Sequence, residues 1–115
     1  MNQHSENIIY VIKNIPAGKV ISYGKIAALA GLVNGARQVV RILHSRSKKD
    51  NLPWFRVVNK EGKIGIKESE AVCRQKELLE NEGVVFTDDC VDDKYFWQIS
   101  SMEEIYRFNH DDMEI

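Results

Sequence analysis

The side chains best suited to bind a planar ligand lie in one short run, Leu52-Pro53-Trp54-Phe55-Arg56-Val57-Val58-Asn59. The indole of Trp54 offers a wide aromatic face, and stacking of a base on such a face is worth ~1–3 kcal/mol. Pro53 stiffens the backbone that leads to this indole. The indole of Trp54 supplies no nucleophile, and the phenyl ring of Phe55 supplies no acid or base. The run therefore predicts binding of a flat group rather than catalysis.

Two cysteines, Cys73 and Cys90, supply the thiols of the chain. Two cysteines make neither a disulfide framework nor a metal site, so we expect no metal and no other cofactor. Cys90 lies among four aspartates, which disfavour the reactive thiolate, whereas Cys73 has the basic neighbours Arg74 and Lys76. Cys73 is thus the one weak candidate for a nucleophile, and the chain is expected not to be an enzyme.

A helix-turn-helix is predicted N-terminal to the run of residues 52–59. Ser22 is a good N-cap for a helix that continues through Ala30, and Gly31 stands where a left-handed C-cap is wanted. Residues 32–35 form the turn, and a second helix is expected over residues 36–45. The second helix of such a motif is usually the recognition element.

The remaining elements are shorter or more local. A first helix is expected over residues 5–14, ended by Pro16, and a later helix over residues 69–82, ended by Gly83. Two pairs of strands are expected: residues 55–59 with 63–66 around the turn 60–62, and residues 84–86 with 95–97. The fold class is mainly α, a winged-helix-like helix-turn-helix domain with a small β hairpin.

A chain of 115 residues has room for one modest core. We expect one domain over residues 1–98 and an acidic C-terminal extension over residues 99–115. The apolar residues Met102, Ile105 and Tyr106 alternate there with acidic ones, so the extension is a helix, a partner-binding segment or a disordered tail.

Charge is divided between the two halves of the chain, although the net charge is only −1. Residues 13–67 hold 12 lysines and arginines against two acidic residues, whereas residues 68–115 hold four basic residues against 14 acidic ones. This division predicts a surface that attracts phosphates in the first half. The alternative is an ordinary solvated surface whose charges happen to segregate.

Four blocks of the chain form one ordered pattern: residues 15–24, residues 27–31 with 36–39, residues 52–59 and residues 78–84. In this order and at these spacings they resemble the DNA-binding domain of the O6-alkylguanine-DNA alkyltransferases. In that family the third block carries a Pro-Cys-His-Arg-Val run whose cysteine accepts the alkyl group. Trp54 and Phe55 replace the cysteine and the histidine. The pattern is thus similar to the alkyltransferase-like proteins, which bind O6-alkylguanine in DNA without repairing it.

The resemblance implies roles for individual residues. A tyrosine at the position of Tyr23 helps to rotate the target nucleotide out of the stack. An arginine at the position of Arg37 inserts through the minor groove and fills the gap, and Arg56 braces the pocket segment. The residues expected to contact DNA are Ser22, Tyr23, Gly24, Ala36, Arg37, Val40 and Arg41. The residues expected to form the base pocket are Tyr23, Pro53, Trp54, Phe55, Val57, Lys63, Ile64 and Gly65.

Structural alternatives stand beside these roles. Tyr23 would merely pack the start of its helix, Arg37 would pair with an acidic neighbour, and Trp54 would belong to the core with the pocket closed. Val40 and Arg41 depart from the family, which usually has glycine after the Ala-Arg-x-Val run. A valine there would hold the helix away from the groove, and Arg41 would offset this with a phosphate contact.

The resemblance implies a non-enzymatic DNA-damage recognition protein that flips O6-alkylguanine out of duplex DNA and marks it for nucleotide excision repair. The expected partners are double-stranded DNA with this lesion and nucleotide excision repair proteins. The alternative is a helix-turn-helix DNA-binding or protein-interaction module without lesion specificity. No dimerisation heptad, membrane span or signal peptide is visible, so we expect a monomer in the cytoplasm, associated with the nucleoid.

Overall fold

The computed structural model describes residues 3–63 and 69–111. Its helices are α1 (Gln3–Lys13), α2 (Tyr23–Leu29), α3 (Ala36–Arg46), α4 (Ser69–Asn81) and α5 (Met102–Asp111), with the short 3-10 helices η1 (Trp54–Arg56) and η2 (Asp93–Tyr95). Its strands are β1 (Ile21–Ser22), β2 (Val57–Val58), β3 (Phe86–Thr87) and β4 (Cys90–Val91). The mainly α fold class with a small β component is confirmed.

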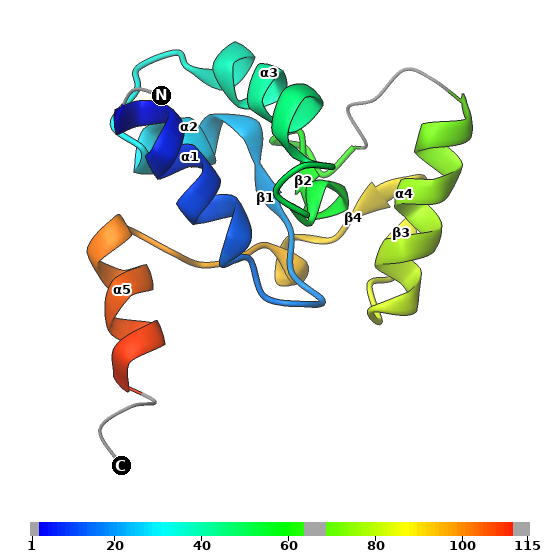
Figure 1. Cartoon of the computed structure of the whole chain (residues 1–115). Coiled ribbons are helices and arrows are strands. Elements are labelled where there is room, and N and C mark those ends of the chain that lie inside the picture. The colour runs from blue at the N-terminus through cyan, green and yellow to red at the C-terminus, as the bar shows by residue number, and fades with distance from the viewer. Residues whose placement is uncertain (1–2, 64–68, 112–115) are drawn as a thin grey trace.

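The first three helices pack together around the larger of two apolar cores (Figure 1). In α1 the spacing of Ile8, Val11 and Ile12 places three apolar side chains on one helical face, and all three are completely buried. The same core contains Ile26 of α2 and Val39 of α3. Burial of this stripe holds the helix-turn-helix against α1.

The helix-turn-helix forms as its capping residues predict. The hydroxyl of Ser22 accepts a hydrogen bond from the Lys25 amide at 3.1 Å, which satisfies one free donor at the start of α2. Gly31 follows α2 with a φ of 87°, the left-handed conformation that glycine adopts without strain. At Gly35 a Cβ would lie 2.7 Å from the Cβ of Leu32, so only glycine fits where the turn folds back.

The strands are short and come from distant parts of the chain. β1 and β2 pair in parallel, with Ile21 opposite Val57 and Ser22 opposite Val58. On the other side of β1, the amide of Val20 donates to the carbonyl of Tyr95 at 2.9 Å. The strands separate α4 from the first three helices (Figure 1). A second core lies around them, made of Val20, Val58, Leu79, Val84 and Val91.

One of the two predicted strand pairings is wrong, and the other stays a prediction. Residues 57–58 pair with β1 along one edge. Asn59 to Lys63 form a tight turn in which the Asn59 amide donates to the Lys63 carbonyl at 3.0 Å, at the place where the turn over residues 60–62 was predicted. A second hairpin, β3–β4, was not predicted. Its two loop residues, Asp88 and Asp89, have φ values of 53° and 62°, as a two-residue hairpin turn requires.

The wrong pairing is that of residues 84–86 with residues 95–97. Phe86 pairs with Val91 across the β3–β4 hairpin, and Phe96 forms a parallel bridge with Val20. Because Val20 lies more than 70 residues before Phe96, this pairing leaves no local pattern in the sequence. A short turn, in contrast, does leave such a pattern. Residues 64–66, the other half of the first predicted hairpin, lie outside the described residues.

The C-terminal extension forms a helix, α5, as far as Asp111, whereas its role in binding a partner stays a prediction. Ile99 and Ile105 are almost completely buried in the larger core, together with residues of α1. The hydroxyl of Ser101 caps the helix by accepting from the Glu104 amide at 3.2 Å. The division of the chain at residue 98 stays a prediction. No helix within the described residues is long and apolar enough to cross a membrane.

Candidate nucleic-acid interface

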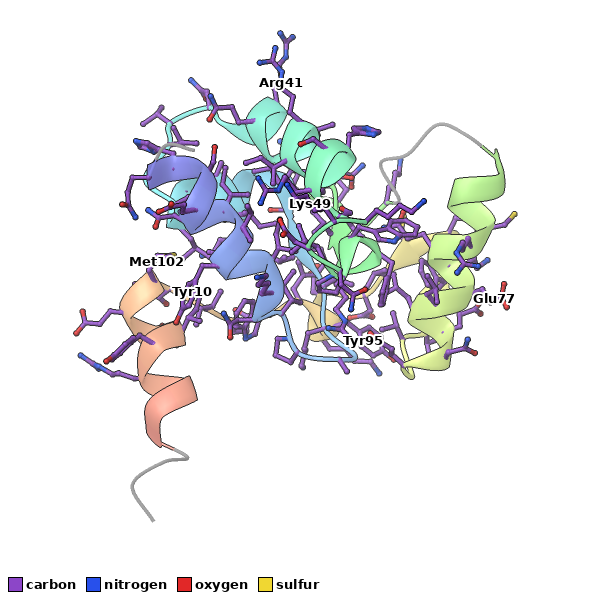
Figure 2. All side chains as sticks on the ribbon, viewed as in Figure 1. Tyr10, Arg41, Lys49, Glu77, Tyr95 and Met102 are labelled. Carbon is purple, nitrogen blue, oxygen red and sulfur yellow. The ribbon has the colours of Figure 1, made fainter. Side chains whose placement is uncertain are left out.

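The outward face of α3 carries the cations that were expected to meet DNA. Arg37, Val40 and Arg41 are exposed, whereas Val39 and Ile42 are buried in the larger core. Figure 2 shows Arg41 pointing straight out from α3. No described residue pairs with the guanidinium of Arg37 or Arg41, so both remain available for an anionic ligand. Pairing of Arg37 with an acidic neighbour is therefore not seen in the described part of the chain.

The basic surface continues beyond the end of α3. Lys48 and Lys49 are exposed there, while Arg46 is bound to Asp50 at 2.8 Å. Some exposed acidic residues lie on other sides: Glu77 on α4 points away from the body on a different side from Arg41 (Figure 2), and Asp88 is in the β3–β4 turn. The exposed Glu103, in contrast, lines a hollow together with Lys25 of α2. The outward face of α3 and the segment after it are thus basic, whereas the side of α2 next to α5 carries both signs of charge.

Tyr23 is the first residue of α2 and packs partly against the larger core. Tyr23 therefore does pack the start of its helix, as the structural alternative states, and its role toward DNA stays a prediction. Burial raises the pKa of the Tyr23 hydroxyl above its ordinary value of 10.0. The hydroxyl keeps its proton at physiological pH and can donate a hydrogen bond to a phosphate or a base.

The β1–β2 pairing joins the helix-turn-helix to the aromatic run. β1 leads directly into Tyr23, and η1 with Trp54 leads directly into β2. Because the two strands are parallel, α2 with Tyr23 follows one end of the pair and η1 with Trp54 precedes the other end. Backbone hydrogen bonds thus link two segments that carry predicted site residues and lie far apart in the sequence.

Trp54 is half-buried and lies on η1. Its ring meets the ring of Phe55 edge-on, with centroids 6.0 Å apart and planes at 89°. Phe55 packs against the smaller core, but within the described chain Trp54 belongs to neither core and is not among the side chains packed on them. The indole is therefore not a core residue in this structure, and whether a base pocket is open beside it stays a prediction.

Arg56 braces the Trp54 segment, as the resemblance implied. Its guanidinium forms an ion pair with Glu82 at the end of α4 and donates to the carbonyl of Ile15 at 2.9 Å. Glu82 also accepts from the Gly18 amide at 3.0 Å. Burial alone would raise the pKa of Glu82, but the hydrogen bonds from Arg56 and Gly18 outweigh burial and hold that pKa below its ordinary value. Glu82 thus ties three separate segments together.

Gln75 is a positioning residue that the sequence analysis missed. Its side chain is completely buried, and its amide nitrogen donates to the carbonyl of Phe55 at 3.1 Å and to that of Val57 at 3.0 Å. These two bonds fasten α4 to the backbone on either side of Arg56. A signal was present, because Gln75 precedes Leu79 by four residues and therefore shares the inward face of α4.

Replacing Gln75 by leucine is expected to lower the free energy of unfolding by about 1–2 kcal/mol, because two buried carbonyls lose their donor. Trp54 should then change its fluorescence, since η1 loses its anchor. Urea unfolding and emission spectra of the native protein measure the two effects. Gln38→Leu, an exposed glutamine on α3, is the matched control. A native emission spectrum unchanged in Gln75→Leu would contradict the positioning role.

Other predicted pocket residues are not gathered around Trp54. Val57 departs from the prediction, because its side chain is completely buried in the larger core and cannot wall an open pocket. Lys63 is exposed, and its backbone forms an isolated antiparallel β-bridge with that of Cys90. Ile64 and Gly65 lie outside the described residues. Pro53 is half-buried directly before η1.

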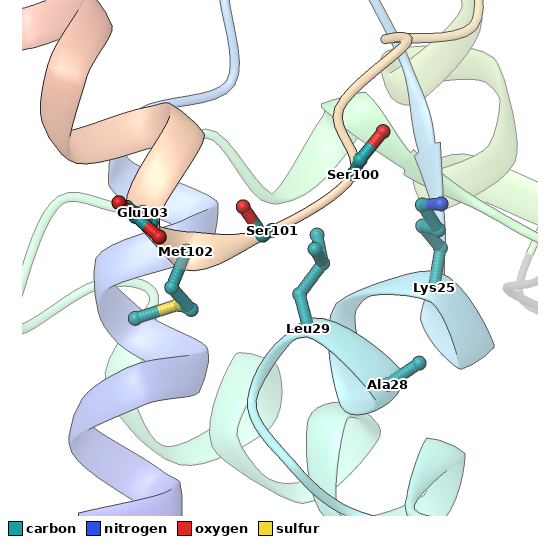
Figure 3. A pocket seen from close by; sticks show the side chains of 7 residues that line it. All are labelled: Lys25, Ala28, Leu29, Ser100, Ser101, Met102 and Glu103. Atoms are coloured by element: carbon teal, nitrogen blue, oxygen red, sulfur yellow. The ribbon is translucent and has the colours of Figure 1, made fainter.

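Two surface hollows lie beside the helix-turn-helix rather than beside Trp54. One is lined by Lys25, Ala28 and Leu29 of α2 together with Ser100 to Glu103 at the start of α5 (Figure 3). The other lies between α2 and α3. Within the described residues, no group of three or more potential metal ligands comes together.

Comparison with known proteins supports a shared origin for this arrangement. Residues 3–84 match the family model described as "6-O-methylguanine DNA methyltransferase, DNA binding domain". A Vibrio parahaemolyticus protein named DNA base-flipping protein is 42% identical over 100 residues, covering 85% of this chain and 99% of that protein. Alkyltransferase-like protein 1 of Schizosaccharomyces pombe is 36% identical over 85 residues, covering 73% of this chain and 79% of that protein.

Solved structures agree with the sequence matches. The crystal structure of S. pombe Atl1 in complex with damaged DNA containing O6-carboxymethylguanine matches with a TM-score of 0.73 and 32% identity. That match covers 86% of this chain and 98% of the other. This chain therefore belongs to the family of the 6-O-methylguanine DNA methyltransferase DNA-binding domain, and its relatives include proteins named alkyltransferase-like and DNA base-flipping.

Proposed function

We propose that this protein binds duplex DNA and holds an O6-alkylguanine outside the helix without transferring the alkyl group. One observation carries the proposal: Trp54 presents a half-buried indole outside both cores, on a segment that Arg56 and Gln75 anchor. An indole held in this way can stack on an extruded base, and such stacking is worth ~1–3 kcal/mol. The relatives named for base flipping and the complex of Atl1 with damaged DNA support the same role.

Docking is assigned to the helix-turn-helix. The exposed face of α3 enters the minor groove, and Arg37 fills the space that the extruded base leaves. Extrusion costs a few kcal/mol, so a planar cation that stacks and donates hydrogen bonds lowers the cost of the flipped state. Tyr23, with its protonated hydroxyl at the start of α2, supports the rotated nucleotide on the backbone side.

Absence of alkyl transfer follows from the chemistry of the residues near the proposed base site. Trp54 supplies no nucleophile where the acceptor cysteine of the methyltransferases would stand. Cys73 is exposed on α4, whereas Gln75, two residues later, is the residue that faces η1. The side chain of Cys73 therefore points away from the indole.

The proposed role as a lesion reader also sets the expected oligomeric state and the step after binding. A lesion reader needs one docking surface for each lesion, whereas a regulator usually dimerises to read paired half-sites. We therefore assign a monomer that acts on cytoplasmic, nucleoid-associated DNA. Its complex with the lesion serves as the mark for nucleotide excision repair proteins, as the resemblance implies.

The test compares two short duplexes that differ only in one O6-methylguanine, at one fixed salt concentration, with the protein mass measured afterwards. The expected result is tighter binding of the modified duplex and an unchanged protein mass. Equal affinities would instead indicate a helix-turn-helix or interaction module without lesion specificity. A mass gain of one methyl group would show alkyl transfer, and loss of that gain in Cys73→Ser would identify the acceptor.

Trp54→Ala is expected to lower the affinity for the modified duplex by about 10-fold, because one stacking surface is lost. Affinity for the unmodified duplex should stay nearly unchanged, since no base is extruded there. Trp54→Phe keeps an aromatic face and should retain most of the preference. Fluorescence anisotropy titrations with both duplexes measure these values. An equal loss on both duplexes would place Trp54 in general DNA contact rather than in base recognition.

A further inference from the structure

An open groove runs between α2 and the start of α3, beside the residues expected to contact DNA. Its volume is about 610 Å³, and its lining consists of Gly24, Ala28, Gly31, Leu32, Val33, Asn34, Gly35 and Ala36. No charged side chain contributes to this lining, and most of the residues are small. A groove of this kind admits an apolar group and lets it approach the protein backbone closely.

Val33 stands on the rim of the groove with 90% of its surface exposed. The turn holds it there: Asn34 adopts a left-handed φ of 56°, and Gly35 packs tightly against Leu32. A single exposed valine is unremarkable by itself. Here the valine adjoins an apolar groove, so a ligand seated in the groove would remove both from water at once.

The groove continues the proposed DNA surface, because Gly24 and Ala36 belong to both. Cations flank it: Lys25 follows Gly24 on α2, and Arg37 follows Ala36 on α3, and both are exposed. One part of DNA has this alternation of an apolar group between anions, namely a deoxyribose between its two phosphates. Bases offer polar edges instead, and the residues that the groove shares with the proposed DNA surface favour DNA as the source of this pattern.

We propose that this groove seats the deoxyribose edge of one DNA strand, with Val33 packed against the sugar. The inference rests on the proposed function and adds to it an apolar anchor that is independent of the lesion. Sugar contacts carry no base information, so the anchor sets the register of the helix-turn-helix on any duplex. Lesion preference then arises at Trp54 and Arg37, not at the groove.

The distinguishing measurement is the salt dependence of binding. Val33→Ser should weaken binding of modified and unmodified duplexes alike by about 10-fold, because burial of a valine side chain is lost. The slope of log K against log salt should not change, since no phosphate contact is removed. Arg41→Gln should instead reduce that slope by about 0.9. Val85→Ser is the matched control, because Val85 is also exposed but lies after α4.

A second variant places a larger side chain on the α2 wall of the groove. Ala28 is exposed on α2, and its methyl group points outward from the helix (Figure 3). Ala28→Leu keeps a good helix former and should again weaken both duplexes with an unchanged salt slope. Wild-type affinity in both Val33→Ser and Ala28→Leu, or a reduced salt slope in Val33→Ser, would overturn the sugar groove alone. Failure of the wild-type protein to bind either duplex would overturn the proposed function as well.

Discussion

Arg37→Ala is expected to lower the affinity for a duplex with O6-methylguanine by about 100-fold, the largest effect of any single substitution on binding. Two contributions add in the flipped complex: stacking of the guanidinium in the vacated space and charge-assisted hydrogen bonds to the unpaired partner base. The fold should be unaffected, because Arg37 is exposed and pairs with no described residue. Anisotropy titration gives the affinity, and a fluorescent base analogue opposite the lesion reports extrusion.

Two control variants separate the contributions of charge and shape. Arg107→Ala removes one exposed arginine from α5, far along the chain from the helix-turn-helix, and should leave affinity nearly unchanged. Arg37→Lys keeps the charge but not the planar fork, so it should recover the salt dependence of the wild-type protein without recovering most of the lesion affinity. If Arg37→Ala lowered the affinity for both duplexes only as much as the loss of a single phosphate contact would, Arg37 would not be the residue that fills the gap.

Glu82→Gln is expected to lower the free energy of unfolding by about 3 kcal/mol at neutral pH, because it leaves the guanidinium of Arg56 without its counter-charge. Both side chains of this pair are more than four-fifths buried, so solvent compensates for little of the loss. Urea unfolding of the wild-type and variant proteins measures the difference. Glu103→Gln removes the exposed pair with Arg107 and should change stability by less than about 0.5 kcal/mol.

The same substitution should change how stability depends on pH. Because Glu82 has a lower pKa in the folded protein than its ordinary value of 4.5, the folded state favours the charged carboxylate. Its contribution is complete above the unfolded pKa and disappears as the pH falls through the folded pKa. The stability difference between wild-type protein and Glu82→Gln should therefore shrink as the pH falls from neutral to below 4.5. A difference that stays constant over this range would contradict the depressed pKa.

Local features of the sequence were sufficient to predict the helix-turn-helix. Ser22 and Gly31 mark the ends of α2 because a cap and a left-handed residue act on their immediate neighbours. Trp54 excludes thiol chemistry at its own position by residue type alone. The division of charge was also visible, because net charge along the chain needs no knowledge of the fold.

The tertiary structure decided how these parts are held relative to one another. The parallel pairing of Ile21 with Val57, the Arg56–Glu82 ion pair and the hydrogen bonds of Gln75 all join residues that are distant in sequence. Such contacts depend on loop closure and on complementary packing, and neither leaves a periodic pattern in the chain. The wrong pairing of residues 84–86 with 95–97 has the same cause. The sequence by itself thus determined the local elements and the residue type at each position, and long-range packing determined how the segment that carries Trp54 is anchored.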